Sequence, residues 1–104
     1  MIVGKHTKQP TEVKDYVVDL SQWLGEAQDA LTAVQAGVIC TSRNDDPQAT
    51  TLTVKSVIMN PALGQVAVWL EKGTDGERYK VTVTSTTAAG RVDESEFVVR
   101  IKEV

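Results

Sequence analysis

The sequence predicts an all-β fold, an antiparallel two-sheet β-sandwich, and three observations carry this prediction. Apolar and polar residues alternate with a period of two over most of the chain from Val13 onward. The alternating segments are short, and clusters of glycine, proline, asparagine and aspartate separate them. No long segment has the period of an amphipathic helix. Each sheet would therefore have one apolar face, and two such faces must meet to leave water.

Length and charge limit the classes of partner. The chain has 104 residues, which suits a single domain, and 41% of them are hydrophobic, as in globular proteins. The 11 basic and 14 acidic residues give a net charge of -3, without a basic run. Nucleic acid is therefore not an expected partner. No stretch approaches the ~20 apolar residues that span a bilayer, and the N-terminal residues do not resemble a signal peptide.

Residues 1–12 are expected to form an N-terminal arm that precedes one β-sandwich domain over residues 13–104. The run from Lys5 to Gln9 is polar and Pro10 follows it, so this segment offers little to bury. Lys5 and Lys8 oppose the acidic remainder of the chain. We therefore expect the arm to lie on a neighbouring subunit or to remain solvated.

The first part of the domain contains one segment that periodicity does not settle. Tyr16, Val18 and Leu20 share one side of a first expected strand. A short helical turn is expected near residues 21–28, around Trp23. The helical spacing of Leu20, Leu24, Ala27 and Leu31 leaves open whether residues 30–41 are helix or strand. Their own alternation and the β-branched pair Val38-Ile39 favour a strand from about Ala30 to Thr41.

Four further strands are expected, each ended by a turn. The residues expected to share one side of each strand are Leu52, Val54, Ser56 and Ile58; Val66, Val68 and Leu70; Tyr79, Val81, Val83 and Ser85; and Phe97, Val99 and Ile101. One apolar face per sheet is expected to result, and the last set is predicted to point inward. The turns contain Gly73, Gly76 and Gly90, which supply positive φ angles.

Tyr79 has a structural interpretation, whereas Trp69 has two alternative ones. Tyr79 starts a strand directly after a glycine-rich turn, where a tyrosine can hydrogen-bond the backbone at the corner of a sandwich. Trp69 lies opposite the Val66-Val68-Leu70 face. It either packs in the core or anchors an interface, because tryptophan is enriched at binding hot spots.

The sequence contains no group of residues typical of catalysis. Cys40 and His6 are the single cysteine and histidine, too few for a thiol site or a soft metal site. Asp45-Asp46 lacks the other ligands of a calcium loop, and Glu94 with Glu96 is typical of a solvated strand edge. We therefore expect no enzyme, no cofactor, no metal and no small-molecule substrate.

The stretch from Val66 to Glu94 resembles the C-terminal half of the phage fiber–tail adaptor family, whose pattern is an apolar strand, a glycine turn, a tyrosine strand rich in threonine, and Gly-Arg followed by acidic residues. Here these features are Trp69-Leu70, Gly73 to Tyr79, and Gly90-Arg91. The N-terminal half is similar too, with Asp15-Tyr16 leading to Trp23-Leu24 and then Asp29. Lys72 is a departure, because members commonly have glycine there.

The resemblance implies an immunoglobulin-like or fibronectin type III-like sandwich in a tailed phage. Such a protein would connect tail or neck components to fibers, be made in the host bacterial cytoplasm, and sit in the virion, in a multicopy ring around the tail axis. Tyr79, Trp23 and the turn glycines would be structural. The candidate interface residues are Lys5, Lys8, Arg43, Asp45, Trp69 and Arg91. The alternative is an exported binding module for a cell-surface or carbohydrate ligand.

Overall fold

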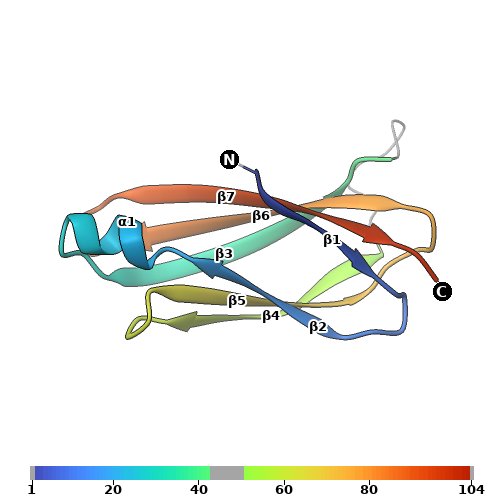
Figure 1. Cartoon of the computed structure of the whole chain (residues 1–104), viewed down its shortest axis with the longest axis horizontal. Helices are drawn as coiled ribbons and strands as arrows, with labels where there is room; N and C mark the ends of the chain where they lie inside the picture. The colour runs from blue at the N-terminus through green and yellow to red at the C-terminus, as the bar shows by residue number, and fades with distance from the viewer. Residues whose placement is uncertain (1, 43–50, 104) are drawn as a thin grey trace.

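The computed structural model describes residues 2–42 and 51–103, with side chains described from Gly4 onward. This part of the chain forms seven strands and one short helix (Figure 1). In chain order these are β1 (Ile2–Lys8), β2 (Lys14–Asp19), α1 (Ser21–Glu26), β3 (Leu31–Cys40), β4 (Leu52–Asn60), β5 (Gln65–Lys72), β6 (Arg78–Thr87) and β7 (Val92–Ile101).

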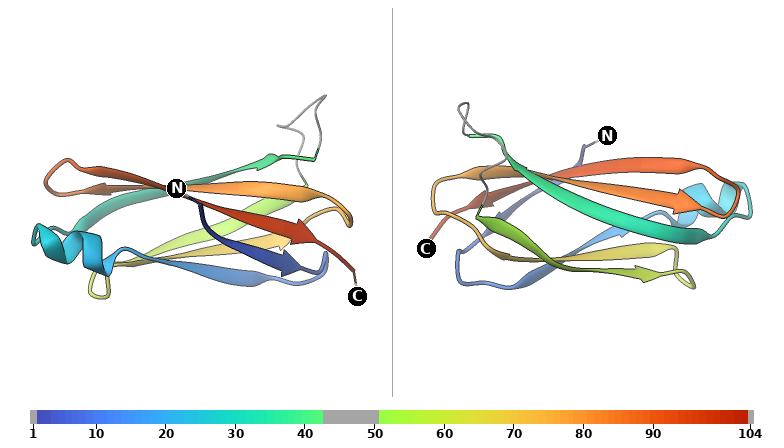
Figure 2. Two further views of the ribbon diagram at one scale, coloured as in Figure 1. Left: turned by 45° about the horizontal axis from the view of Figure 1, so that its top comes forward. Right: turned by 180° about the vertical axis from the view of Figure 1, so that it is seen from behind.

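The strands form two sheets that face one another, as the views in Figures 1 and 2 show. The four-stranded sheet has the order β1-β7-β6-β3, and the three-stranded sheet has the order β2-β5-β4. The predicted β-sandwich is therefore confirmed. Its neighbouring strands are antiparallel with one exception, the parallel pair of β1 and β7.

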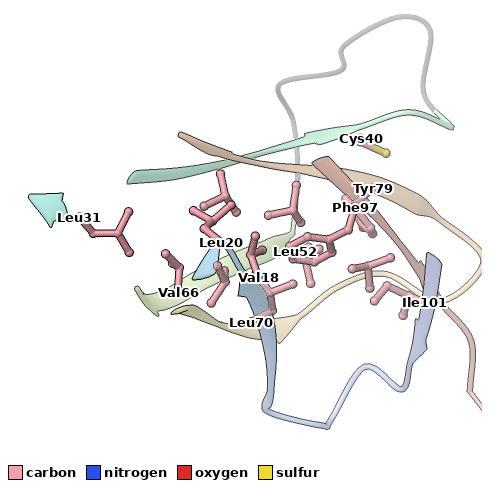
Figure 3. Close-up of a cluster of buried hydrophobic side chains, with 14 of the residues drawn as sticks. Val18, Leu20, Leu31, Cys40, Leu52, Val66, Leu70, Tyr79, Phe97 and Ile101 are labelled. Carbon is pink, nitrogen blue, oxygen red and sulfur yellow. The ribbon is translucent and has the colours of Figure 1, made fainter. Parts of the chain in front are cut away.

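The core lies between the two sheets and contains the inward residues of both (Figure 3). Val66, Val68 and Leu70 of β5 are completely buried. On the opposite sheet, the alternate residues of β6 and β7 are buried, from Tyr79 and from Phe97 onward. The inward faces predicted for these three strands are thus confirmed, and strict alternation follows because each strand has a neighbour on both sides and one face against the core.

Residues 21–41 resolve as a helix followed by a strand, as the sequence favoured. The helix α1 ends before Gln28, whose φ of 50° is left-handed. The strand β3 then pairs with β6 along its length. The helical spacing thus indicated α1 correctly, and the β-branched residues near the end of β3 indicated the strand that follows it.

The expectation of a separate N-terminal arm is wrong for residues 2–8, because they form β1 at the edge of the four-stranded sheet. Lys8 is fully buried, and its ammonium donates to the carbonyl oxygens of Lys72 at 2.6 Å and Gln9 at 2.9 Å. Lys72 has a φ of 66°, the left-handed conformation that favours glycine. The sequence indicated only a polar run, since the pairing that orders β1 comes from β7 at the other end of the chain.

The face predicted for the strand after Leu52 is a second correction. A bulge between Val54 and Ser56 shifts the register of β4 against β5. Ile58 consequently points outward and is 52% exposed, while Val57 and Met59 pack against the core. A single extra residue in a strand moves every later side chain to the opposite face.

Candidate functional site

The two chemically reactive side chains occupy different surroundings. The buried Cys40 thiol donates to Glu77 Oε2 at 3.3 Å. The His6 ring packs with Tyr16 and Phe97, at centroid distances of 4.8 and 5.8 Å. The described residues contain no cluster of histidine, cysteine and carboxylate side chains that could hold a metal ion. In the same part of the chain, no helix is long and apolar enough to cross a membrane.

Three residues of the family-like pattern meet at one end of the sandwich. The Arg91 guanidinium lies 4.3 Å from the centroid of the Trp23 ring. Its Nε donates to Asp29 Oδ2 at 3.0 Å, and its Nη2 donates to the Trp23 carbonyl at 3.3 Å. These contacts join α1 to the turn between β6 and β7. Arg91, a candidate interface residue, therefore binds within its own domain and keeps 32% of its side chain exposed.

The surroundings of Asp29 favour its charged form. A hydrogen bond with the Thr87 side chain is the largest cause, and bonds from the Ala30 and Ala89 amides and from Arg91 add to it. Together they lower the pKa of Asp29 from 3.8 to about 2, although burial opposes the shift. The carboxylate is 2% exposed. Its contacts therefore stabilise the fold above pH 3.8 and are lost as the pH falls through about 2.

The other end of the sandwich is closed around Tyr79. The Tyr79 hydroxyl accepts a hydrogen bond from the Thr74 amide at 3.0 Å and lies 3.1 Å from the Thr51 hydroxyl. Gly73 precedes this corner with a φ of 108°, and a Cβ there would come within 2.7 Å of Ile101. Gly76 and Gly90 also have positive φ, with open space around them. Tyr79 and these glycines therefore have structural roles in the turns.

Trp69 lies on the outer face of the three-stranded sheet, since it alternates with the buried Val68 and Leu70. Val17 and Ile58 lie on either side of Ala67 across the strands, and they are 56% and 52% exposed. We call Val17, Ile58, Ala67 and Trp69 the outer apolar patch. Exposed apolar residues that adjoin one another mark interaction sites more often than scattered ones do.

A basic corner, which we define as Lys5, Arg78 and Arg100, lies on the four-stranded sheet. Arg78 and Arg100 are directly opposite one another on β6 and β7. All three line a surface hollow together with His6, Thr7 and Val98. Like charges that face each other across strands repel, so an anionic partner would offset the cost of this arrangement.

The candidate interface residues thus have different positions. Lys5 is exposed in the basic corner and Trp69 lies in the outer apolar patch. Lys8 is buried, which is a correction, because its ammonium is bound to backbone carbonyls and does not reach the surface. Arg43 and Asp45 lie outside the described residues.

Sequence reasoning expected Arg100 to point outward and placed Val17 opposite Tyr16 and Val18, but it named neither of them, nor Ile58, as an interface residue. Val17 had a visible signal, because it makes Tyr16-Val17-Val18 an unbroken apolar run within a strand that otherwise alternates. Ile58 had none, because the bulge that turns it outward depends on the pairing of β4 with β5.

A protein-family model matches residues 8–100, from the last residue of β1 to the penultimate residue of β7. The family is described as "Podophage GP4 fiber-tail adaptor protein gp77". No curated protein matches the chain. Since the match covers most of the chain, from β2 through β7 and including the two corners around Trp23 and Tyr79, the chain belongs to the podophage fiber-tail adaptor family, whose members are structural proteins of the phage tail.

Proposed function

We propose that this adaptor joins the tail or neck of a podophage to its fibers through protein-protein contacts alone, and that it acts without catalysis. Membership of the fiber-tail adaptor family supports contact with tail and fiber proteins and a place in the virion. The protein would be made in the host cytoplasm before assembly, and several copies would surround the tail axis.

One observation carries the proposal further, namely that the two outer faces differ in chemistry. The three-stranded sheet presents the outer apolar patch, beside the exposed carboxylates of Asp15 and Asp19 on β2. The four-stranded sheet presents the basic corner. A connector must hold two different partners at once, and two chemically distinct faces on opposite sides of a thin sandwich meet this need.

The experiment is gold labelling of purified phage particles with an antibody to this chain. We expect label at the tail or neck. If the protein is absent from particles but binds cells or glycans when free, the connector function is wrong and the alternative of a cell-surface or carbohydrate-binding module replaces it.

A matched pair of variants tests the outer apolar patch in the same particles. Val17→Lys changes a patch residue that is 56% exposed, and Val92→Lys changes an apolar residue that is 61% exposed and lies outside the patch. We expect particles with Val17→Lys to lose either the adaptor or the fibers, and particles with Val92→Lys to keep both. Equal incorporation and equal fiber content in the two variants would contradict a role for the patch.

A further inference from the structure

The two sheets end in four edge strands, and one of them differs from the others. Lysine, aspartate or histidine side chains lie on β1, β2 and β4, and β4 also carries a bulge. These are the devices by which proteins prevent an edge from pairing with another chain. β3 too has an irregularity, between Leu31 and Ala33. It differs from the other edges in charge, because none of its ten residues, Leu-Thr-Ala-Val-Gln-Ala-Gly-Val-Ile-Cys, is charged.

Within the described part of the chain, β3 pairs with a strand on one side only, although β4 of the other sheet lies close to it. β3 pairs with β6 on one side, and it forms the end of its sheet on the other. Seen from behind, it crosses in front of its neighbours (Figure 2, right). Gln35 and Gly37 are exposed on the outer face of the sheet, while Val34, Ala36 and Val38 point inward and are only partly buried. An added strand would pair with these backbone groups and cover the inward side chains.

The residue order of β3 suits a second copy of itself. In an antiparallel pair centred on Ala36, each residue faces the one equally far on the other side of the centre. Val34 then faces Val38 of the other copy, and Gln35 faces Gly37. The first is a pair of β-branched residues on the inward side, and such pairs stabilise adjacent strands. Charged residues are absent from both strands, so the pairing brings no like charges together.

We propose that β3 pairs with β3 of a second copy across a two-fold axis, so that the two four-stranded sheets become one continuous sheet. The interface is isologous, because each strand contributes the same residues to it. This inference rests on the proposed multicopy arrangement of the adaptor. It adds that the repeating unit of that arrangement is a dimer.

The test measures the mass of the purified full-length chain by sedimentation over a range of concentrations. We expect a monomer-dimer equilibrium that added salt does not weaken, because the interface has no charges to screen. A chain that remains monomeric up to its solubility limit would overturn the proposal. It would leave the connector function standing, since particle labelling tests that function separately.

Gly37→Lys is the decisive variant. A Cβ at Gly37 meets open space and its φ is not left-handed, so the substitution should fold. It places an ammonium in both halves of the interface, and the dissociation constant of the dimer should rise about tenfold, the equivalent of ~1.4 kcal/mol. Gly37→Thr is the uncharged control and should keep the dimer. Thr53→Lys adds the same charge to the β4 edge, and it too should keep the dimer.

A second substitution tests the register. Gln35→Glu combined with Gly37→Lys places a carboxylate opposite each new ammonium in the register centred on Ala36, so this double variant should recover dimerisation. If Gly37→Lys leaves the dimer intact, or if Thr53→Lys disrupts it instead, copies associate through another surface and the proposal is wrong.

Discussion

The central strands and the edge strands of this sandwich follow different rules. β5, β6 and β7 each lie between two neighbours, and their side chains alternate between buried and outward positions almost without exception. β1 and β4 lie at edges, and one is held by a buried lysine while the other changes face at a bulge. A strand between two partners has its register determined on both sides, whereas an edge strand has one partner and can tolerate irregularity.

The largest expected loss of stability comes from a core substitution in the central strand β7. Phe97→Ala removes a ring that is 1% exposed and that contacts the rings of Tyr16 and His6. We expect a loss of about 3–5 kcal/mol in the free energy of unfolding, measured by urea denaturation, because the cavity cannot close in a packed core. Val98→Ala, the next residue on β7 and outward-facing, should cost far less. Similar losses for the two variants would mean that the sheet does not pack as described.

The second effect concerns the edge strand β1. Lys8→Met keeps the length of the side chain but removes its hydrogen bonds to the Lys72 and Gln9 carbonyls. We expect a loss of about 1–3 kcal/mol, because two partly buried carbonyl oxygens lose their donor. Lys5→Met, on the same strand but exposed, should change stability little. If Lys8→Met is neutral in thermal and urea denaturation, β1 does not depend on this anchor.

The third effect depends on pH and tests the corner that joins α1 to the β6–β7 turn. The pKa of Asp29 is lowered to about 2, so its charged form stabilises the native state above pH 3.8, and this stabilisation disappears as the pH falls toward about 2. Asp29→Asn should lower the melting temperature at pH 7 and reduce the loss of stability between these pH values. Asp15→Asn, at an exposed position on β2, serves as the control. An unchanged acid profile in Asp29→Asn would show that the corner does not hold a charged carboxylate.

The smallest expected change in stability tests the position of the bulge in β4. Ile58→Thr should change the free energy of unfolding by less than about 0.5 kcal/mol, because the side chain points outward after the bulge. Met59→Thr should cost more, since Met59 packs against the core. The reverse order in urea denaturation would place the bulge elsewhere and restore the regular alternation that the sequence suggested.

Local sequence patterns were sufficient for the central strands and for the turns. The alternation of Val66, Val68 and Leu70 and the glycines before Tyr79 depend on residues next to one another, and the structure agrees with both. The pattern that carried the family resemblance was local as well. The contacts among Trp23, Asp29 and Arg91 could not be predicted locally, because Arg91 and Asp29 come from distant parts of the chain.

The sequence by itself therefore determined the fold class, the inward faces of β5 to β7 and the family. Only the tertiary structure decided that residues 2–8 join a sheet, that Ile58 turns outward, that Lys8 is buried, and that β3 is an edge. The physical reason is that periodicity records which side of a strand meets the core. The identity of a strand's neighbours depends on pairing between segments far apart in the chain, which no local pattern encodes.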